Sequence, residues 1–404
     1  MARRNGGFIG TDGLDAPDPP TGVTSTAGDA SVSVAFTAPT DAGTSAITGF
    51  VAQVSINDTA YSAGSNTGTS SPIVVSSLTN GTAATAKVWA INAFGTSAPS
   101  DASASFTPIV PPIALFGAGH STAENYTTAI DKVDIASLGN GADFGNLSVG
   151  RSSDPGAFAS STRGIWAGGN TGSFSDVIDY VTIASAGNAT DFGNLSAARS
   201  QMAGLSNSTR GVVSGGDNDG GRVNIIEYVT IANTGNATDF GNLSIVSFTG
   251  AGFASPTRGV MTLGYDEDGA NASSNVIEYI TIGSTGNSTD FGDLTAARYN
   301  VAGFASATRG VVGGGQGAAT TIDYVTIAST GNATDFGDPV ENARNQGAAS
   351  SKTRGLFAGG FLSAQRNVIQ YITIASTGNA QDFGDLSISV FRNAGLSNSH
   401  GGLA

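Results

Sequence analysis

Short runs of alternating apolar and polar residues fill the first quarter of the chain. Val32-Ser-Val34-Ala-Phe36 has the period of two that turns one face of a β-strand inward. Similar runs follow over residues 47–54, 73–75 and 88–91, and turn-rich stretches separate them. This spacing predicts a small β-sandwich over residues 17–108.

The order of short motifs within this segment resembles a fibronectin type III domain. The motifs are Pro17-Asp-Pro-Pro20, Ala38-Pro39, Ser45-Ala-Ile47-Thr-Gly-Phe50, Leu78-Thr-Asn-Gly81-Thr and Val88-Trp-Ala90-Ile-Asn92-Ala-Phe-Gly95. Phe36 stands where that family usually has a core tryptophan, and Ala84 stands in the place of its corner tyrosine. The alanine removes a buried ring and its hydroxyl bond, so we expect a less stable copy. The resemblance implies a spacer and docking domain without an active site.

From residue 113 onward, one pattern of apolar strands, glycines and turns occurs six times. The tripeptide Asp-Phe-Gly recurs every 45 to 51 residues, beginning at Asp143, Asp191, Asp239, Asp290, Asp335 and Asp382. Thr-Arg-Gly recurs with its arginine at Arg163, Arg210, Arg258, Arg309 and Arg354, and we expect His400-Gly401 to be the sixth counterpart. Repeats of this length with short strands are typical of propeller blades, so six repeats predict six blades.

The blade pattern resembles the kelch repeat: paired glycines, a tyrosine, a large aromatic residue and an arginine. Phenylalanine stands where kelch blades usually carry tryptophan, at Phe144, Phe192, Phe240, Phe291, Phe336 and Phe383. The first repeat lacks its opening strand, and residues 393–400 supply a strand of that kind at the end of the chain. We therefore expect an all-β protein with a fibronectin type III-like β-sandwich, a linker at 109–112, and a six-bladed kelch-like β-propeller over 113–404. The C-terminal strand would close the propeller and remove its open sheet edges.

Composition and charge narrow the classes of partner. The chain has no cysteine, which excludes disulfides and thiolate metal sites. Its net charge of −14 argues against nucleic acid and anionic membranes as the main partners. No apolar run approaches the ~20 residues that a membrane span needs, so we expect no membrane insertion.

The first ten residues contain two arginines but no apolar stretch that would make a secretory signal. We interpret residues 1–16 as a docking arm, with Arg3, Arg4, Phe8 and Ile9 as candidate contacts. A disordered terminus is the alternative interpretation.

The recurring charged residues favour an architectural role over a catalytic one. The aspartates of the Asp-Phe-Gly motif occur once in each of the six repeats. Five arginines downstream of the motif occur at most once per repeat, at Arg151, Arg199, Arg298, Arg344 and Arg392. A role repeated in every blade is that of a charge pair or a side-chain-to-backbone bond between neighbouring strands. No phosphate-binding loop accompanies Asp-Phe-Gly, so its match to protein kinases is accidental. We predict no catalytic residue, no cofactor and no enzyme activity.

The two histidines are the other candidates for chemistry. His120 and His400 lie near opposite ends of the repeat region, in strands that we expect to be neighbours in the first blade. Paired surface histidines are the interpretation we prefer, and a two-histidine metal site stays open. A copper-oxidase propeller is not expected, because its copper site also needs a cysteine. A sialidase propeller is not expected either, because the Ser-x-Asp-x-Gly-x-Thr-Trp motif of sialidases does not occur in the sequence.

Variable loops follow the glycine-ended strands and should emerge on one face of the ring, where they would form a binding surface. The candidate ligand-binding residues in these loops are Phe174, Asp217, Asn218, Asp219, Tyr265, Asp266, Glu267, Asp268 and Phe361. A calcium site is a weak further candidate in two of these loops, at Asp217, Asp219, Asp266 and Asp268. Our default interpretation of these loops is solvent-exposed turns without a metal ion.

The chain resembles structural proteins of tailed bacteriophages such as marine cyanophages. The features that carry this resemblance are repeats of the type Ala-Ser-Thr-Gly-Asn-Ala-Thr-Asp-Phe-Gly-Asp-Leu and the start Arg-Asn-Gly-Gly-Phe-Ile-Gly. The resemblance implies a fibre, tail or head-decorating virion component at the particle surface, made in the host cytoplasm. Its arm and sandwich would bind other virion proteins, and its propeller would bind a host cell-surface glycan or protein; homo-oligomerisation stays open. A glycan-degrading propeller enzyme and a bacterial extracellular adhesin are the alternatives.

Overall fold

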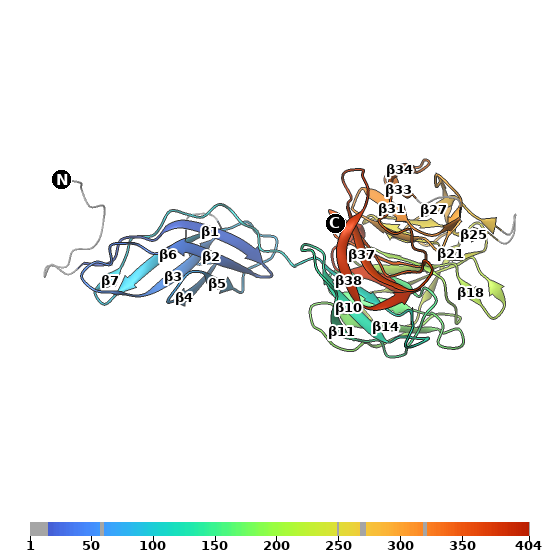
Figure 1. Cartoon of the computed structure of the whole chain (residues 1–404), viewed down its shortest axis with the longest axis horizontal. Helices are drawn as coiled ribbons and strands as arrows, with labels where there is room; N and C mark the ends of the chain where they lie inside the picture. Colours follow the sequence, from blue (N-terminus) through green and yellow to red (C-terminus); the bar gives the residue numbers. More distant parts are fainter. Residues whose placement is uncertain (1–14, 57–59, 249, 267–271, 318–320, 404) are drawn as a thin grey trace. The chain divides into compact units, whose positions relative to one another are not determined.

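The computed structural model describes residues 15–56, 60–248, 250–266, 272–317 and 321–403. Within these ranges the chain is all-β and forms small antiparallel sheets, most of them four-stranded, which confirms the expected fold class at this level. The chain divides into two compact units, Met1–Pro111 and Pro112–Ala404 (Figure 1). One 3-10 turn, Gly401–Leu403, lies among the described residues. None of their helical segments has the length and apolar character required to cross a membrane.

Two antiparallel sheets make up the first unit. The three-stranded sheet has the order β1-β2-β5, formed by Thr21–Gly28, Ser31–Thr37 and Ile73–Ser76. The four-stranded sheet has the order β4-β3-β6-β7, formed by Gly64–Gly68, Ile47–Ser55, Thr85–Asn92 and Gly95–Thr96. The four alternating runs of the sequence all lie in these strands.

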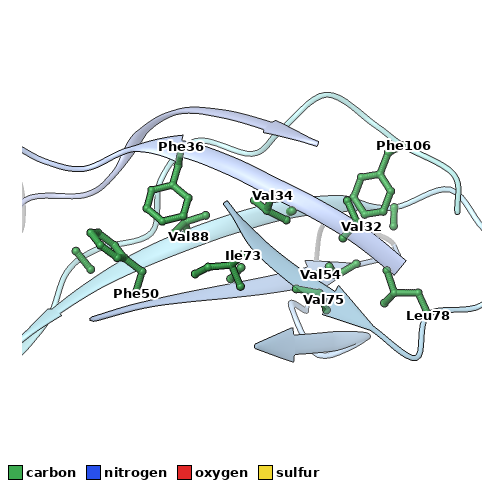
Figure 2. Packing of buried hydrophobic residues seen from close by; sticks show 14 residues of the cluster. Val32, Val34, Phe36, Phe50, Val54, Ile73, Val75, Leu78, Val88 and Phe106 are labelled. Carbon is green, nitrogen blue, oxygen red and sulfur yellow. The ribbon is translucent and has the colours of Figure 1, made fainter. Parts of the chain in front are cut away.

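The inward faces of those strands form a continuous apolar core (Figure 2). Phe36 contacts Phe50, with ring centroids 4.8 Å apart. Ala84 is buried and exchanges two backbone hydrogen bonds of 2.8 Å with Phe106, whose ring lies in the same core. An additional phenylalanine therefore packs into the core beside the position where the resemblance expects a tyrosine.

The second unit contains six larger antiparallel sheets among its described residues, each with the same strand order. The first sheet consists of β39 (Ala394–Ser397), β8 (Ile113–Gly117), β10 (Ala129–Asp134) and β11 (Ala142–Asn146). The second consists of β12 (Gly156–Ala159), β13 (Arg163–Ala167), β14 (Val177–Thr182) and β15 (Thr190–Asn194). The third consists of β16 (Ala203–Ser206), β17 (Arg210–Ser214), β20 (Ile225–Thr230) and β21 (Thr238–Asn242).

The remaining sheets repeat this arrangement. The fourth consists of β23 (Gly252–Ala254), β24 (Arg258–Thr262), β27 (Val276–Thr281) and β28 (Thr289–Asp293). The fifth consists of β30 (Ala302–Ala305), β31 (Arg309–Gly313), β33 (Ile322–Thr326) and β34 (Thr334–Gly337). The sixth consists of β35 (Gly347–Ser350), β36 (Arg354–Ala358), β37 (Arg366–Thr373) and β38 (Gln381–Phe391), and β9 (His120–Ser121) adds a fifth strand. Short strands beside them are β18 (Asp217–Asn218), β19 (Gly221–Arg222), β22 (Ser247–Phe248), β25 (Tyr265–Asp266), β26 (Ala272–Ser273), β29 (Arg298–Tyr299) and β32 (Gln316–Gly317).

The first strands of the six sheets contact one another in the order β39, β12, β16, β23, β30, β35 and β39 again. The approach is close: a Cβ atom on Gly204 would lie 2.5 Å from the backbone nitrogen of Ala157. β39 comes from the end of the chain and pairs with β8 from the start of this unit. The first sheet is therefore built from both ends of the repeat region.

A second set of bonds joins each sheet to the next through the turn that precedes Asp-Phe-Gly. The asparagine of the turn accepts a hydrogen bond of 3.0–3.1 Å from the backbone nitrogen three residues after the Asp of the preceding sheet. The donor and acceptor pairs are Asn146–Asn188, Asn194–Asn236, Asn242–Asn287, Asp293–Asn332, Asp338–Asn379 and Asp385–Asn140. The last pair joins the sixth sheet to the first.

The Thr-Arg-Gly arginines make a third contact between sheets. Each guanidinium lies 4.2–4.7 Å from a tyrosine ring on the next strand of its own sheet. Each also donates to a backbone carbonyl of the following sheet, and the pairs are Arg163–Ile231, Arg210–Ile282, Arg258–Ile327, Arg309–Ile374 and Arg354–Ile135. Ile113 occupies the corresponding position in the first sheet, where its nitrogen donates to Asn398 Oδ1. The expectation that His400-Gly401 is the sixth counterpart was wrong. In the first sheet, the first strand (β39) and the second strand (β8) come from opposite ends of the repeat region, so the second strand begins at Ile113 and not at the residues that follow β39.

The aspartates of Asp-Phe-Gly do not form the predicted charge pairs. All six lie exposed on the fourth strand of their sheet, and the described residues give their side chains no bond. The phenylalanine that follows is buried; in the second to sixth sheets its ring meets that same tyrosine edge-on at 5.9–6.1 Å. The motif's structural role therefore belongs to its phenylalanine and glycine.

Three of the five arginines that follow the leucine form buried ion pairs. Arg151–Asp179, Arg199–Glu227 and Arg298–Asp323 have nitrogen–oxygen distances of 2.5, 2.6 and 3.0 Å, and their side chains are at most 1% exposed. The acidic partners stand on the third strands, between an isoleucine and a tyrosine. A single acidic residue inside an apolar strand is a signal that the sequence analysis missed.

Arg344 and Arg392 do not belong to this set, which corrects the expectation of five equivalent arginines. They stand one and two residues further from Asp-Phe-Gly than the other three. Ala343 and Val390 occupy the position equivalent to Arg199. In all three, the backbone carbonyl accepts a hydrogen bond from the backbone nitrogen of the second glycine in a Gly-Gly pair.

Candidate functional site

A ring of short backbone pairings surrounds one end of the second unit. Each pairing joins the residue nine positions after an Asp-Phe-Gly aspartate to the residue that follows the glycine-ended strand of the next sheet. The pairs are Ser152–Asn170, Ser200–Asp217, Phe248–Tyr265, Tyr299–Gln316, Arg344–Phe361 and Phe391–His120. We call these twelve residues the loop ring. The variable loops all leave from it, and strands β18 and β25 lie on the same side of the second unit in Figure 1.

The loop ring is asymmetric although the strands beneath it repeat. Two successive pairs contain only Ser152, Asn170, Ser200 and Asp217, which are small or polar. The other four pairs contain all of the ring's aromatic side chains, its histidine and its arginine. Because architecture alone would repeat in every sheet, this difference makes the arc with the aromatic side chains the candidate site.

Part of this arc is a first aromatic cluster, formed by Arg222, Phe248, Tyr265 and Tyr299. The Tyr265 ring lies 5.4 Å from the rings of both Phe248 and Tyr299. The Arg222 guanidinium lies 4.3 Å from the centroid of Phe248 and 4.8 Å from that of Tyr265. These side chains come from the loops within and directly after the third and fourth sheets.

The other part of the arc is a second aromatic cluster, formed by His120, Arg344, Phe361 and Phe391. The Phe391 ring lies 5.1 Å from His120 and 5.2 Å from Phe361. The Arg344 guanidinium lies 5.0 Å from the Phe361 centroid and donates to Gln316 Oε1 at 2.5 Å. These side chains are half-buried, so their outer surfaces stay accessible.

The structure places the predicted binding residues unevenly. Tyr265 and Phe361 belong to the two clusters, whereas Phe174 is half-buried and pairs with Asn170 on the polar side of the loop ring. Asp217 and Asn218 lie in the β18–β19 hairpin, with Asp219 exposed at its tip.

Several predicted residues cannot be assigned a place. Glu267, Asp268, the side chain of Asp266, and the arm residues Arg3, Arg4, Phe8 and Ile9 lie outside the described part of the chain. Within that part, no group of three or more His, Asp or Glu side chains is arranged to hold a metal ion.

Sequence reasoning missed Phe248, Tyr299 and Phe391, and it gave Arg344 an architectural role. Counting nine residues from each Asp-Phe-Gly aspartate finds all four, with serine at the equivalent place in the other two repeats. A position that changes character between repeats was the available signal.

A cavity of about 120 Å³ lies between the six first strands. Asp154 stands at its margin, where Oδ2 accepts a 3.0 Å hydrogen bond from Asn345 Nδ2. Burial raises the pKa of Asp154 to about 6, against the opposing effects of Arg392 and the Asn345 bond. Both Asp154 and Asn345 have left-handed backbones, with φ of 48° and 54°.

His400 lies at the other end of the first strands. Its Nε2 is 3.0 Å from the carbonyl oxygen of Ala159 and 3.3 Å from Ser206 Oγ, and burial lowers its pKa. His120 instead pairs with β38 of the sixth sheet. The expectation that the two histidines are neighbours in the first blade was therefore wrong, because β9 joins the edge of a different sheet.

The cavity does not bring its ionisable groups together. Asp154 precedes the first residue of β12, and His400 contacts the last residue of that strand, Ala159. A four-residue strand separates the two by roughly 13 Å at about 3.3 Å per residue, too far for direct proton transfer.

No protein-family model and no curated protein matches this chain.

Proposed function

We propose that the six larger sheets are the blades of a kelch-like β-propeller over residues 113–404, closed by β39. Three contacts support this arrangement: the first strands follow one another in a cycle, the turn asparagines bond in a cycle, and Arg354 joins the sixth sheet to the first. The two sheets and shared core of the first unit support a fibronectin type III-like sandwich over residues 17–108.

The propeller's proposed function is non-enzymatic adhesion through the loop ring. The single observation that carries this proposal is the asymmetry of the ring: equivalent positions hold serine in two sheets and aromatic or arginine side chains in four. Half-buried aromatic side chains on a rigid scaffold offer large contact area at small entropic cost.

The proposed location is the surface of a bacteriophage particle. The resemblance of the repeats to those of marine cyanophages motivates it, with the N-terminal arm and sandwich as the attachment to other virion proteins. Many copies on one particle would strengthen weak individual contacts with host glycans or proteins. Electron microscopy of purified particles tests this location, and particles that lack the chain would refute it.

Binding of the full chain to a printed glycan array and to host cells tests adhesion. We expect Tyr299→Ala and Phe361→Ala to reduce binding at least tenfold, because each removes one ring from a cluster. Tyr126→Ala is the matched control, since Tyr126 is 37% exposed and belongs to neither cluster. Equal binding by all three variants would contradict the assignment of the loop ring, and release of reducing sugar would favour the glycan-degrading enzyme.

A further inference from the structure

The second aromatic cluster combines ring faces with a positive charge that has no acidic partner among the described residues. Arg344 bonds only to the amide oxygen of Gln316, and no described carboxylate lies within ion-pair distance of it. The nearby acid, Glu341, uses both carboxylate oxygens to bind Arg366. Arg344 therefore keeps guanidinium donors for an anionic ligand.

A second arginine lies beside this cluster, but it has an acidic neighbour. The Arg392 guanidinium lies 5.6 Å from the centroid of Phe391. Its acidic neighbour, Asp154, is half-buried, and desolvation raises its pKa to about 6, so it is mostly ionised at pH 7 and offsets the charge of Arg392. His120 contributes ring nitrogens, one of which lies 3.5 Å from Gln365. Among the described residues, Arg344 is therefore the positive charge of this cluster without a carboxylate at ion-pair distance, in a chain whose net charge is −14.

The first aromatic cluster has a different electrostatic setting. The backbones of Arg222 and Asp217 are opposite one another in the β18–β19 hairpin, and Asp219 stands at the tip of that hairpin. Asp266 directly follows Tyr265 in the sequence. The first cluster thus has acidic residues adjacent to it in the sequence, whereas Arg344 makes the second cluster the one suited to an anion.

We infer that the second aromatic cluster binds an acidic saccharide, with an apolar sugar face on Phe361 and Phe391 and the sugar's carboxylate or sulfate on Arg344. The aromatic rings supply contact area for the carbon-bound hydrogens of a sugar ring. The guanidinium supplies the planar pair of donors that matches a carboxylate or sulfate. This inference rests on the proposed adhesive function and names its ligand class.

Calorimetric titration of the full chain with oligogalacturonate tests the inference, with the carboxyl-reduced oligosaccharide as the neutral match and a sulfated oligogalactan as a second acidic probe. We expect at least one acidic probe to bind, at least tenfold more tightly than the neutral one, and its affinity to fall as salt rises. Binding of the sulfated probe alone would identify sulfate as the recognised group.

Three variants locate the site. We expect Arg344→Gln to lose at least tenfold in affinity for the acidic probe and Arg344→Lys to lose less. Lys352→Gln removes one exposed positive charge away from the loop ring and should change nothing. Thermal unfolding of each variant, followed by the fluorescence of Trp166, which is fully buried in the second unit, shows whether it is folded.

The outcomes separate this inference from the proposed function. Equal affinity for acidic and neutral probes, or full affinity of a folded Arg344→Gln, would overturn the acidic-saccharide site while leaving adhesion intact. Binding of host cells without binding of any saccharide would also overturn it and would indicate a protein receptor. Failure to bind either cells or saccharides would refute the proposed function itself.

Discussion

The buried pair between Arg199 and Glu227 allows a sharp test of how the sheets are held together. The guanidinium nitrogen lies 2.6 Å from Glu227 Oε2, and both side chains are 1% exposed. Arg199→Ala would leave the Glu227 carboxylate buried without its counter-charge. Removing one partner of a buried pair typically costs about 3–5 kcal/mol, and we expect a loss of that size in the free energy of unfolding.

The sixth sheet contains a neutral version of the same site, which supplies a matched rescue. There Ala343 takes the place of the arginine and Gln370 that of the acid, with Oε1 accepting from the backbone nitrogen of Val340 at 2.7 Å. Arg199→Ala combined with Glu227→Gln copies this pair. The double variant should lose only about 1–3 kcal/mol, the cost of the space left by the arginine, and so be more stable than Arg199→Ala.

Urea unfolding of the full chain at pH 7 measures these differences. The chain has two tryptophans, so a Trp89→Phe background leaves Trp166 as the reporter of the second unit. Trp166 is fully buried and its Nε1 donates to the carbonyl of Ala394 at 3.2 Å. An Arg199→Ala loss below about 1 kcal/mol, or a double variant no more stable than the single one, would refute the argument from burial.

Three further predictions concern the cavity and the contacts between sheets. The folded-state pKa of Asp154 lies above its ordinary 3.8, so its contribution to stability is complete below pH 3.8 and is lost as pH rises through about 6. Asp154→Asn should therefore stabilise the protein by about 3 kcal/mol at pH 8 and leave it unchanged at pH 3.5, whereas a pH-independent effect in thermal unfolding would count against this account. Gly193→Ala should lower the free energy of unfolding by about 1–3 kcal/mol more than Gly235→Ala does. Both glycines have positive φ (148° and 158°), but only at Gly193 would a Cβ lie 2.4 Å from a carbonyl oxygen. Equal melting temperatures of the two variants would contradict this prediction. Arg354→Met should lower the free energy of unfolding by about 1–2 kcal/mol, because it removes the 2.8 Å hydrogen bond to the carbonyl of Ile135. Amide hydrogen exchange should then become faster in the first and sixth sheets. Unchanged exchange in both sheets would show that this bond does not join them.

Local patterns in the sequence were sufficient for the strands and for the number of repeated sheets. The alternation from Val32 to Phe36 predicts β2 because the side chains of a strand point to opposite faces in turn. The buried phenylalanine of each Asp-Phe-Gly motif follows from its regular recurrence, since equivalent positions in repeated units meet equivalent surroundings. Tyr265 and Phe361 could be predicted as candidate binding residues because they directly follow the glycine-ended strands.

The tertiary structure decided which charges are buried and which side chains meet on the loop ring. A shift of one residue moves Arg344 from the buried position, where Ala343 lies, to the ring beside Phe361, because neighbouring residues of an extended chain point in opposite directions. The partner of Arg199 lies 28 residues away on another strand, and His120 joins the sheet that contains Phe391. The sequence by itself determined the repeated strands, because the period of a strand is local. Only the packed sheets decided the site, because its members come from repeats far apart in the chain and meet through register and closure.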